Sequence, residues 1–186
     1  MDDQFLKNLK WPNCIIDSSD FGSKPNFERM HQLSLAYLKA AQRLCVAIGE
    51  ETLLQEWPNA SVVYFLIYHS TELFLKASIL KQNPKCKELH HDIGKLKEFY
   101  RELFPEEENN FHSPWGFSAK KIDELFGEPV FSGIDRNPDQ KYRYFSDKSG
   151  GSPKSINSFS PGYILNYINY LSIQWNKLWM KQSEKG

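Results

Sequence analysis

The sequence predicts an all-α domain, an antiparallel bundle of four to five helices with a small hairpin or irregular insertion before the last helix. Apolar residues recur at helical spacing in several segments, and capping and stop residues bound those segments. The helical period disappears only over residues 128–159, where the insertion is expected. A chain of 186 residues has the size of one domain, so we expect a single domain over 1–186, with an irregular N-terminal arm at 1–25.

The first long helix is expected to begin at Asn26, read as its N-cap, and to end at Gly49. Residues 51–57 should form a short helical turn before the next helix. The predicted inner face of the first helix is a stripe that follows helical spacing, made of Leu33, Tyr37, Ala40, Leu44 and Ile48.

The longest apolar run of the chain lies between Asn59 and Lys81, after a start signal at Pro58. Its apolar residues fall on nearly every side of a helix, which predicts a central helix packed by several neighbours. Ionisable residues interrupt the run, so it is not expected to span a membrane. These residues are His69, Glu72 and Lys76.

A third helix is expected after Asp92 as its cap, with Pro105 as its stop. A short helix should follow Ser118, and a turn cluster at 135–138 predicts the hairpin. The last helix is expected to begin at Ser160-Pro161, and its tail at 181–186 is expected to fray. The predicted inner residues are Ile93, Leu96, Tyr100 and Leu103 in the third helix, and Ile164, Ile168, Leu171, Trp175 and Leu178 in the last.

Composition restricts the classes of partner and compartment. Lysine plus arginine equals aspartate plus glutamate at 23 each, so no overall field attracts nucleic acid or membrane, and any nucleic-acid binding must come from a local patch. The three cysteines, Cys14, Cys45 and Cys86, are widely spaced, which argues against a disulfide framework and for a reducing cytoplasm. The first residues do not resemble a signal peptide. We therefore expect a cytoplasmic protein.

The main candidate site is the polar line within the central segment. His69, Glu72 and Lys76 are spaced i, i+3 and i+7 and share one helix face. A charge line inside an apolar helix needs partners from another segment, and the best candidate is His91, turned inward to meet Glu72. We expect Glu72, Lys76 and His91 to form one hydrogen-bonded cluster. Two interpretations remain open: a structural network, or a site with His69, Glu72 and His91 as catalytic candidates and Lys76 as a binding residue.

A second candidate is the stretch from Lys141 to Phe145, which interleaves basic and aromatic residues. Lys141, Arg143 and Tyr144 could hold a single strand, with a ring stacked on a base and cations at phosphates. The same pattern fits a strand with one face on the core. Cys86, His90 and His91 could suggest a metal, but adjacent histidines point in different directions, so no metal and no cofactor are expected.

The order of three features resembles the HEPN superfamily of small all-α domains. These are a first long helix, the run Glu72-Leu73-Phe74-Leu75-Lys76 in the second, and His91-Asp92-Ile93-x-x-Leu96 opening the third. The match covers residues 30–104, and the last helix more loosely; Arg143 to Asp147 is similar to a segment of some relatives. The resemblance implies a HEPN-like bundle, often a homodimer, from toxin–antitoxin, phage-defence or RNA-processing systems, where a nucleotidyltransferase-type antitoxin is a possible partner.

Many HEPN members are ribonucleases that use an Arg-x4–6-His motif, and no arginine of this chain has a histidine at that spacing. The resemblance therefore favours a nucleotide- or RNA-binding or protein-interaction module of a bacterial defence, toxin–antitoxin or stress system, with no membrane contact. One alternative is a metal-independent endoribonuclease, with His69, His91 and Glu72 in acid–base roles and Lys76 or Arg143 at the phosphate. The other is a structural domain that dimerises through its aromatic-rich last helix.

Overall fold

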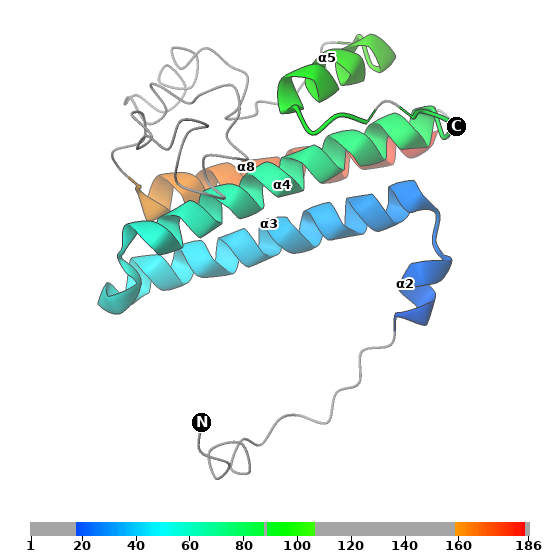
Figure 1. Cartoon of the computed structure of the whole chain (residues 1–186). Coiled ribbons are helices and arrows are strands. Elements are labelled where there is room, and N and C mark those ends of the chain that lie inside the picture. Colours follow the sequence, from blue (N-terminus) through cyan, green and yellow to red (C-terminus); the bar gives the residue numbers. More distant parts are fainter. Residues whose placement is uncertain (1–17, 88, 107–158, 185–186) are drawn as a thin grey trace, which may run out of the picture.

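The computed structural model describes residues 18–87, 89–106 and 159–184, and every regular element in these ranges is helical (Figure 1). The predicted all-α bundle is thereby confirmed. The expected short helix after Ser118 and the expected hairpin lie outside the described residues. The elements are α2 (Ser19–Ser23), α3 (Asn26–Glu50), the 3-10 turn η1 (Thr52–Leu54), α4 (Trp57–Gln82), α5 (Ile93–Leu103) and α8 (Pro161–Glu184).

Three long helices, α3, α4 and α8, lie side by side along the length of the molecule (Figure 1). The helices α3 and α8 run antiparallel. The end of α3 lies beside the start of α8, where Cys45 Sγ donates to the carbonyl of Pro161. The ends of α4 and α8 meet instead, where Lys81 donates to the carbonyl of Trp179, so these two helices run in the same direction. The shorter α5 packs on α4.

The helix α4 is buried on nearly every side, as its sequence predicts. It begins at Trp57, slightly before the expected start, with Pro58 in its first turn. Small hydroxyl residues let neighbouring helices come close, and their polar groups are satisfied by backbone carbonyls: Ser70 Oγ donates to Ser34 of α3 at 2.6 Å, and Thr71 Oγ1 to Ile67 at 2.9 Å. In the described part of the chain, no helix has the length and the apolar content needed to cross a membrane.

The buried face of α3 differs from the predicted one. Leu33 and Ala40 of the predicted stripe are exposed, whereas a face that includes small and polar residues packs against α4 and α8. A stripe drawn through apolar residues alone misses this face, because small and polar side chains such as Ser34 and His31 are part of the helix contact. The observed buried residues are His31, Ser34, Leu38, Ala41, Cys45 and Ile48.

Three further expectations at helix ends need correction. Asn26 is the first residue of α3 rather than its cap, and no side chain caps that end. The helix α2 occupies residues 19–23, inside the stretch expected to be an irregular arm. The tail of α8 is helical to Glu184 rather than frayed, because Gln182 is buried and Lys81 also donates to Ser183 Oγ at 2.6 Å.

The two elements that carry the candidate site follow their sequence closely. Asp92 caps α5 as predicted, with Oδ1 accepting from the backbone of Gly94 at 2.7 Å and Lys95 at 3.2 Å. The predicted inner residues Ile93, Leu96 and Tyr100 of α5 are buried, as are the five predicted inner residues of α8. The cap and the packing of α5 therefore fix the segment before it, which holds His91 over α4.

Candidate functional site

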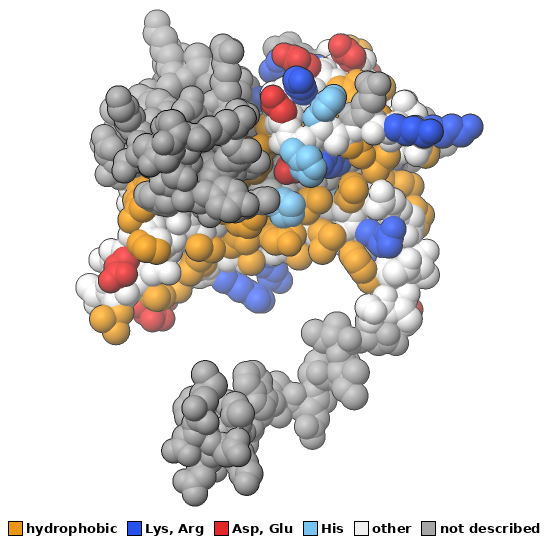
Figure 2. All heavy atoms as spheres, in the orientation of Figure 1, with side chains coloured by type: hydrophobic (Ala, Val, Ile, Leu, Met, Phe, Trp, Pro, Cys, Tyr) orange, Lys and Arg blue, Asp and Glu red, His pale blue; other side chains and the backbone are white. Residues whose placement is uncertain are grey.

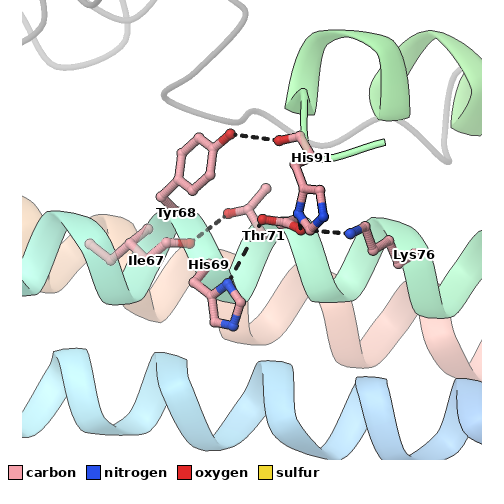
Figure 3. A network of polar contacts seen from close by, with 7 residues as sticks. Ile67, Tyr68, His69, Thr71, Lys76 and His91 are labelled. Carbon is pink, nitrogen blue, oxygen red and sulfur yellow. Dashed lines mark hydrogen bonds and ion pairs between the residues drawn. The ribbon is translucent and has the colours of Figure 1, made fainter. Parts of the chain in front are cut away.

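The carboxylate of Glu72 is the centre of a polar cluster between α4 and the segment before α5. Figure 3 labels its partners Lys76 on α4 and His91 on that segment. Lys76 Nζ lies 2.7 Å from Glu72 Oε1, and His91 Nδ1 lies 2.9 Å from the same oxygen. On the other side, His69 Nδ1 lies 3.8 Å from Oε2, which is too long for a hydrogen bond and leaves an electrostatic contact. The predicted cluster of Glu72, Lys76 and His91 is confirmed, and His69 stands at its edge.

Glu72 is ionised in this setting although it is only 4% exposed. Burial by itself raises the pKa of the carboxyl group, but the contacts with His69 and Lys76 and the charges of Lys76 and His91 outweigh burial and lower the pKa to about 2. A carboxylate in this state only accepts hydrogen bonds, so the groups that point at it act as donors. Glu72 therefore sets the orientation of its neighbours.

His91 is the exposed member of the cluster, with its side chain 82% accessible. Since Glu72 accepts from Nδ1, the neutral imidazole keeps its proton on Nδ1 and presents Nε2 as an acceptor. The backbone of His91 is also bound to α4, because the hydroxyl of Tyr68 donates to the His91 carbonyl at 3.0 Å (Figure 3). Both the ring and the main chain of His91 are thus held from α4.

His69 is more enclosed, with a quarter of its side chain exposed. The ring of Phe65 stacks on it at 5.8 Å between centroids, and the ring of Tyr37 from α3 meets it edge-on at 4.7 Å. Two aromatic side chains from two helices therefore hold this imidazole in place. Tyr37 and Tyr68 are the residues of the site that the sequence did not indicate, because their contacts depend on how helices pack.

Lys76 lies under the surface rather than on an exposed helix face. An exposed i,i+4 pair contributes a few tenths of a kcal/mol, whereas losing one partner of a buried pair costs about 3–5 kcal/mol. The ammonium neutralises Glu72, and its proximity disfavours a bound metal cation. No group of three or more histidine, cysteine or acidic residues is placed to hold a metal within residues 18–87, 89–106 and 159–184.

The remaining candidate residues divide into two groups. Lys141, Arg143 and Tyr144 lie outside the described residues. His90, next to His91 in the chain, is exposed, and it is His91 rather than His90 that contacts Glu72. Figure 2 shows histidine side chains gathered on the face where α5 meets α4. A ligand on this face can meet an imidazole that is oriented by an ionised carboxylate, which suits hydrogen bonding to an anion or proton transfer.

No protein-family model, curated protein or solved structure matches this chain. The site described above is consequently supported by the chain's own residues and their contacts. The resemblance to the HEPN superfamily stays a prediction, carried by the order of Glu72, Lys76, His91 and Asp92 in the sequence.

Proposed function

We propose that this chain is a HEPN-like RNA- or nucleotide-binding module, and that the face around Glu72, His69 and His91 is its binding site. The observation that carries the proposal is a buried, ionised carboxylate that orients the imidazole of His91 at the surface. A cluster that only held α5 in place would not need its outermost member to be an imidazole that is largely open to solvent.

The chemistry of the face suits a phosphate or the edge of a base. An imidazole that gains a proton when a phosphate arrives becomes a double donor, and Glu72 stabilises the added charge from behind. The negative charge of Glu72 is kept inside and is matched by Lys76, so it does not repel the ligand strongly. The chain has no formal net charge, so binding is expected to come from this local face. Because the contact is made to a phosphate, added salt should weaken it.

The test is fluorescence anisotropy of the full chain with labelled single-stranded RNA and with labelled ATP. We expect His91→Ala to weaken binding about tenfold, since one charge-assisted contact is lost. His90→Ala is the matched control, because it removes the neighbouring exposed imidazole that does not contact Glu72. The proposal fails if neither ligand binds, or if the two variants weaken binding equally.

A second candidate function is a metal-independent endoribonuclease, favoured by the contact between Glu72 and His91 Nδ1. The carboxylate fixes the tautomer whose Nε2 can take the proton from a ribose 2′-hydroxyl, and a protonated His69 would give a proton to the leaving 5′-oxygen. The attacking 2′-oxygen forms the new bond to phosphorus as the bond to the 5′-oxygen breaks, which leaves a 2′,3′-cyclic phosphate. No redox partner or metal takes part.

Cleavage of RNA in the presence of EDTA tests this second function. Products that end in a 2′,3′-cyclic phosphate, retained in His90→Ala and lost in His91→Ala, would establish it. Bound RNA that stays intact with the wild-type chain would rule it out and leave the binding module.

The resemblance adds a homodimer and a partner protein to the proposal. Ile173 and Met180 of α8 are both exposed and are spaced i, i+7, so they lie on one helix face that a second copy of the chain could cover. Light scattering of the wild type and of Ile173→Lys tests the dimer. A monomeric wild type would reject it.

A further inference from the structure

A second site lies away from the Glu72 cluster, where the start of α3 meets the ends of α4 and α8. The structure has a pocket of about 400 Å³ here, within the range of small-molecule sites. Its walls include Glu28 and His31 of α3, Lys81 of α4, and Trp179 and Gln182 of α8. It shares no residue with the cluster around Glu72.

Two deeply buried side chains in the pocket wall each have one polar atom without a hydrogen-bond partner. His31 is 8% exposed and Gln182 is 6% exposed. Among the residues that the structure describes, His31 Nε2 and Gln182 Oε1 have no partner. A buried polar atom gains free energy when it is paired, so these two atoms beside one pocket are available to a ligand that supplies the missing bonds after a small side-chain rotation.

The pocket offers one charge of each sign. Lys81 Nζ donates to the carbonyl of Trp179 at 3.1 Å and to Ser183 Oγ at 2.6 Å, which leaves one N–H. The carboxylate of Glu28 makes no hydrogen bond or ion pair within the described part of the chain, although its charge influences Lys81. Burial, together with the charge of Lys81, lowers the pKa of His31 to about 4, so its ring adds no charge at neutral pH.

The aromatic surface of the pocket is already used within the protein. The ring of His31 stacks on Trp179 at 3.8 Å between centroids and is nearly parallel to it. The ammonium of Lys81 lies 4.1 Å from the centroid of the same indole. We therefore assign recognition to charge and hydrogen bonding rather than to a base stacked on Trp179.

We propose that this pocket binds a small zwitterion, an α-amino acid or a dipeptide, with its carboxylate on Lys81 and its ammonium on Glu28. Gln182 Oε1 then accepts from an N–H of the ligand, and His31 Nε2 pairs with a further polar group. Two opposite charges in a small neutral pocket match a zwitterion, whereas a polyphosphate would face the carboxylate of Glu28 without compensation.

Isothermal titration calorimetry of the full chain with L-glutamine, L-leucine and glycyl-L-glutamine tests the proposal. N-acetyl-L-glutamine lacks the ammonium, and L-glutaminamide lacks the α-carboxylate. We expect at least one of the three zwitterions to bind at micromolar to millimolar concentration, and each glutamine derivative, which lacks one charge, to bind about tenfold more weakly than L-glutamine.

Two variants locate the binding. Lys81→Met should weaken binding of the zwitterion but leave binding of L-glutaminamide unchanged, because that derivative has no carboxylate for Lys81. Glu28→Gln should weaken binding of the zwitterion but leave binding of N-acetyl-L-glutamine unchanged, because that derivative has no ammonium for Glu28. Glutamine has the same shape as the half-buried glutamate, so we expect the fold to be preserved. Circular dichroism confirms folding of both variants.

The result that would overturn the proposal is no heat from any of the three zwitterions, equal binding of the derivatives, or variants that bind as the wild type does. RNA binding by Glu28→Gln is expected to equal that of the wild type. This measurement separates the pocket from the Glu72 face, so either proposal can fail alone.

Discussion

Replacing Glu72 with glutamine is expected to destabilise the protein at neutral pH. Glutamine keeps the size of the side chain and one oxygen acceptor but removes the negative charge. Lys76 then stays under the surface beside a neutral amide, and His91 loses the charge that orients it. An ammonium left in this position without its counter-charge is costly.

The magnitude follows from the pKa of Glu72. The pKa falls from 4.5 to about 2 on folding, and each unit is worth about 1.4 kcal/mol, so the ionised carboxylate contributes about 3 kcal/mol. The contact with His91 is screened by water because that side chain is largely exposed. We therefore expect a loss of about 2–3 kcal/mol in the free energy of unfolding at pH 7.

The loss has a characteristic pH dependence. A carboxyl group whose pKa is lowered by folding stabilises the folded state fully above its unfolded pKa, here 4.5, and this stabilisation disappears as the pH falls toward 2. Glutamine does not titrate. The difference in stability between the wild type and Glu72→Gln should therefore be largest above pH 4.5 and shrink below it.

Urea unfolding followed by circular dichroism, at a series of pH values, measures this difference. Glu98→Gln is the matched control, because Glu98 is an exposed residue of α5, and its replacement should change stability by less than about 0.5 kcal/mol. Equal stability of Glu72→Gln and the wild type at pH 7, or a difference between them that does not change on acidification, would show that the charge of Glu72 does not stabilise the fold.

Three further predictions concern the scaffold. Asp92→Ala removes the acceptor for the Gly94 N–H and should lower the free energy of unfolding in urea by about 1 kcal/mol. No measurable loss would contradict the role of the cap. Trp175→Ala opens a cavity at a fully buried position and should cost about 3–5 kcal/mol; a loss under 1 kcal/mol would contradict the packing. Burial raises the pKa of the Cys45 thiol to about 11, so an alkylating reagent at pH 8 should modify Cys86 before Cys45, as mass spectrometry can establish.

Local rules account for the parts of the fold that the sequence predicted well. The cap at Asp92 and the inner stripe of α8 depend only on neighbouring residues and on helical spacing, so both can be predicted from the sequence. The failure at α3 has the opposite cause. Its contact face includes His31 and Ser34, and nothing local marks these polar residues as buried.

The candidate sites show the same division. The cluster of Glu72, Lys76 and His91 was predictable because charges within an apolar helix require partners. The contact of Tyr37 with His69 was not, because it depends on the rotation of α3 against α4. The pocket beside Trp179 is assembled from the ends of three helices that are far apart in the sequence, so no motif indicates it.

The most direct test of the proposed binding site is nuclear magnetic resonance of the imidazole nitrogens during titration with single-stranded RNA. We expect the resonances of His69 and His91 to shift together and saturate, while that of His90 changes little. The shift at His91 should be smaller in Glu72→Gln, since the carboxylate that orients the ring is gone. Shifts confined to His90, or no shift at any histidine of this face, would contradict the proposed binding site.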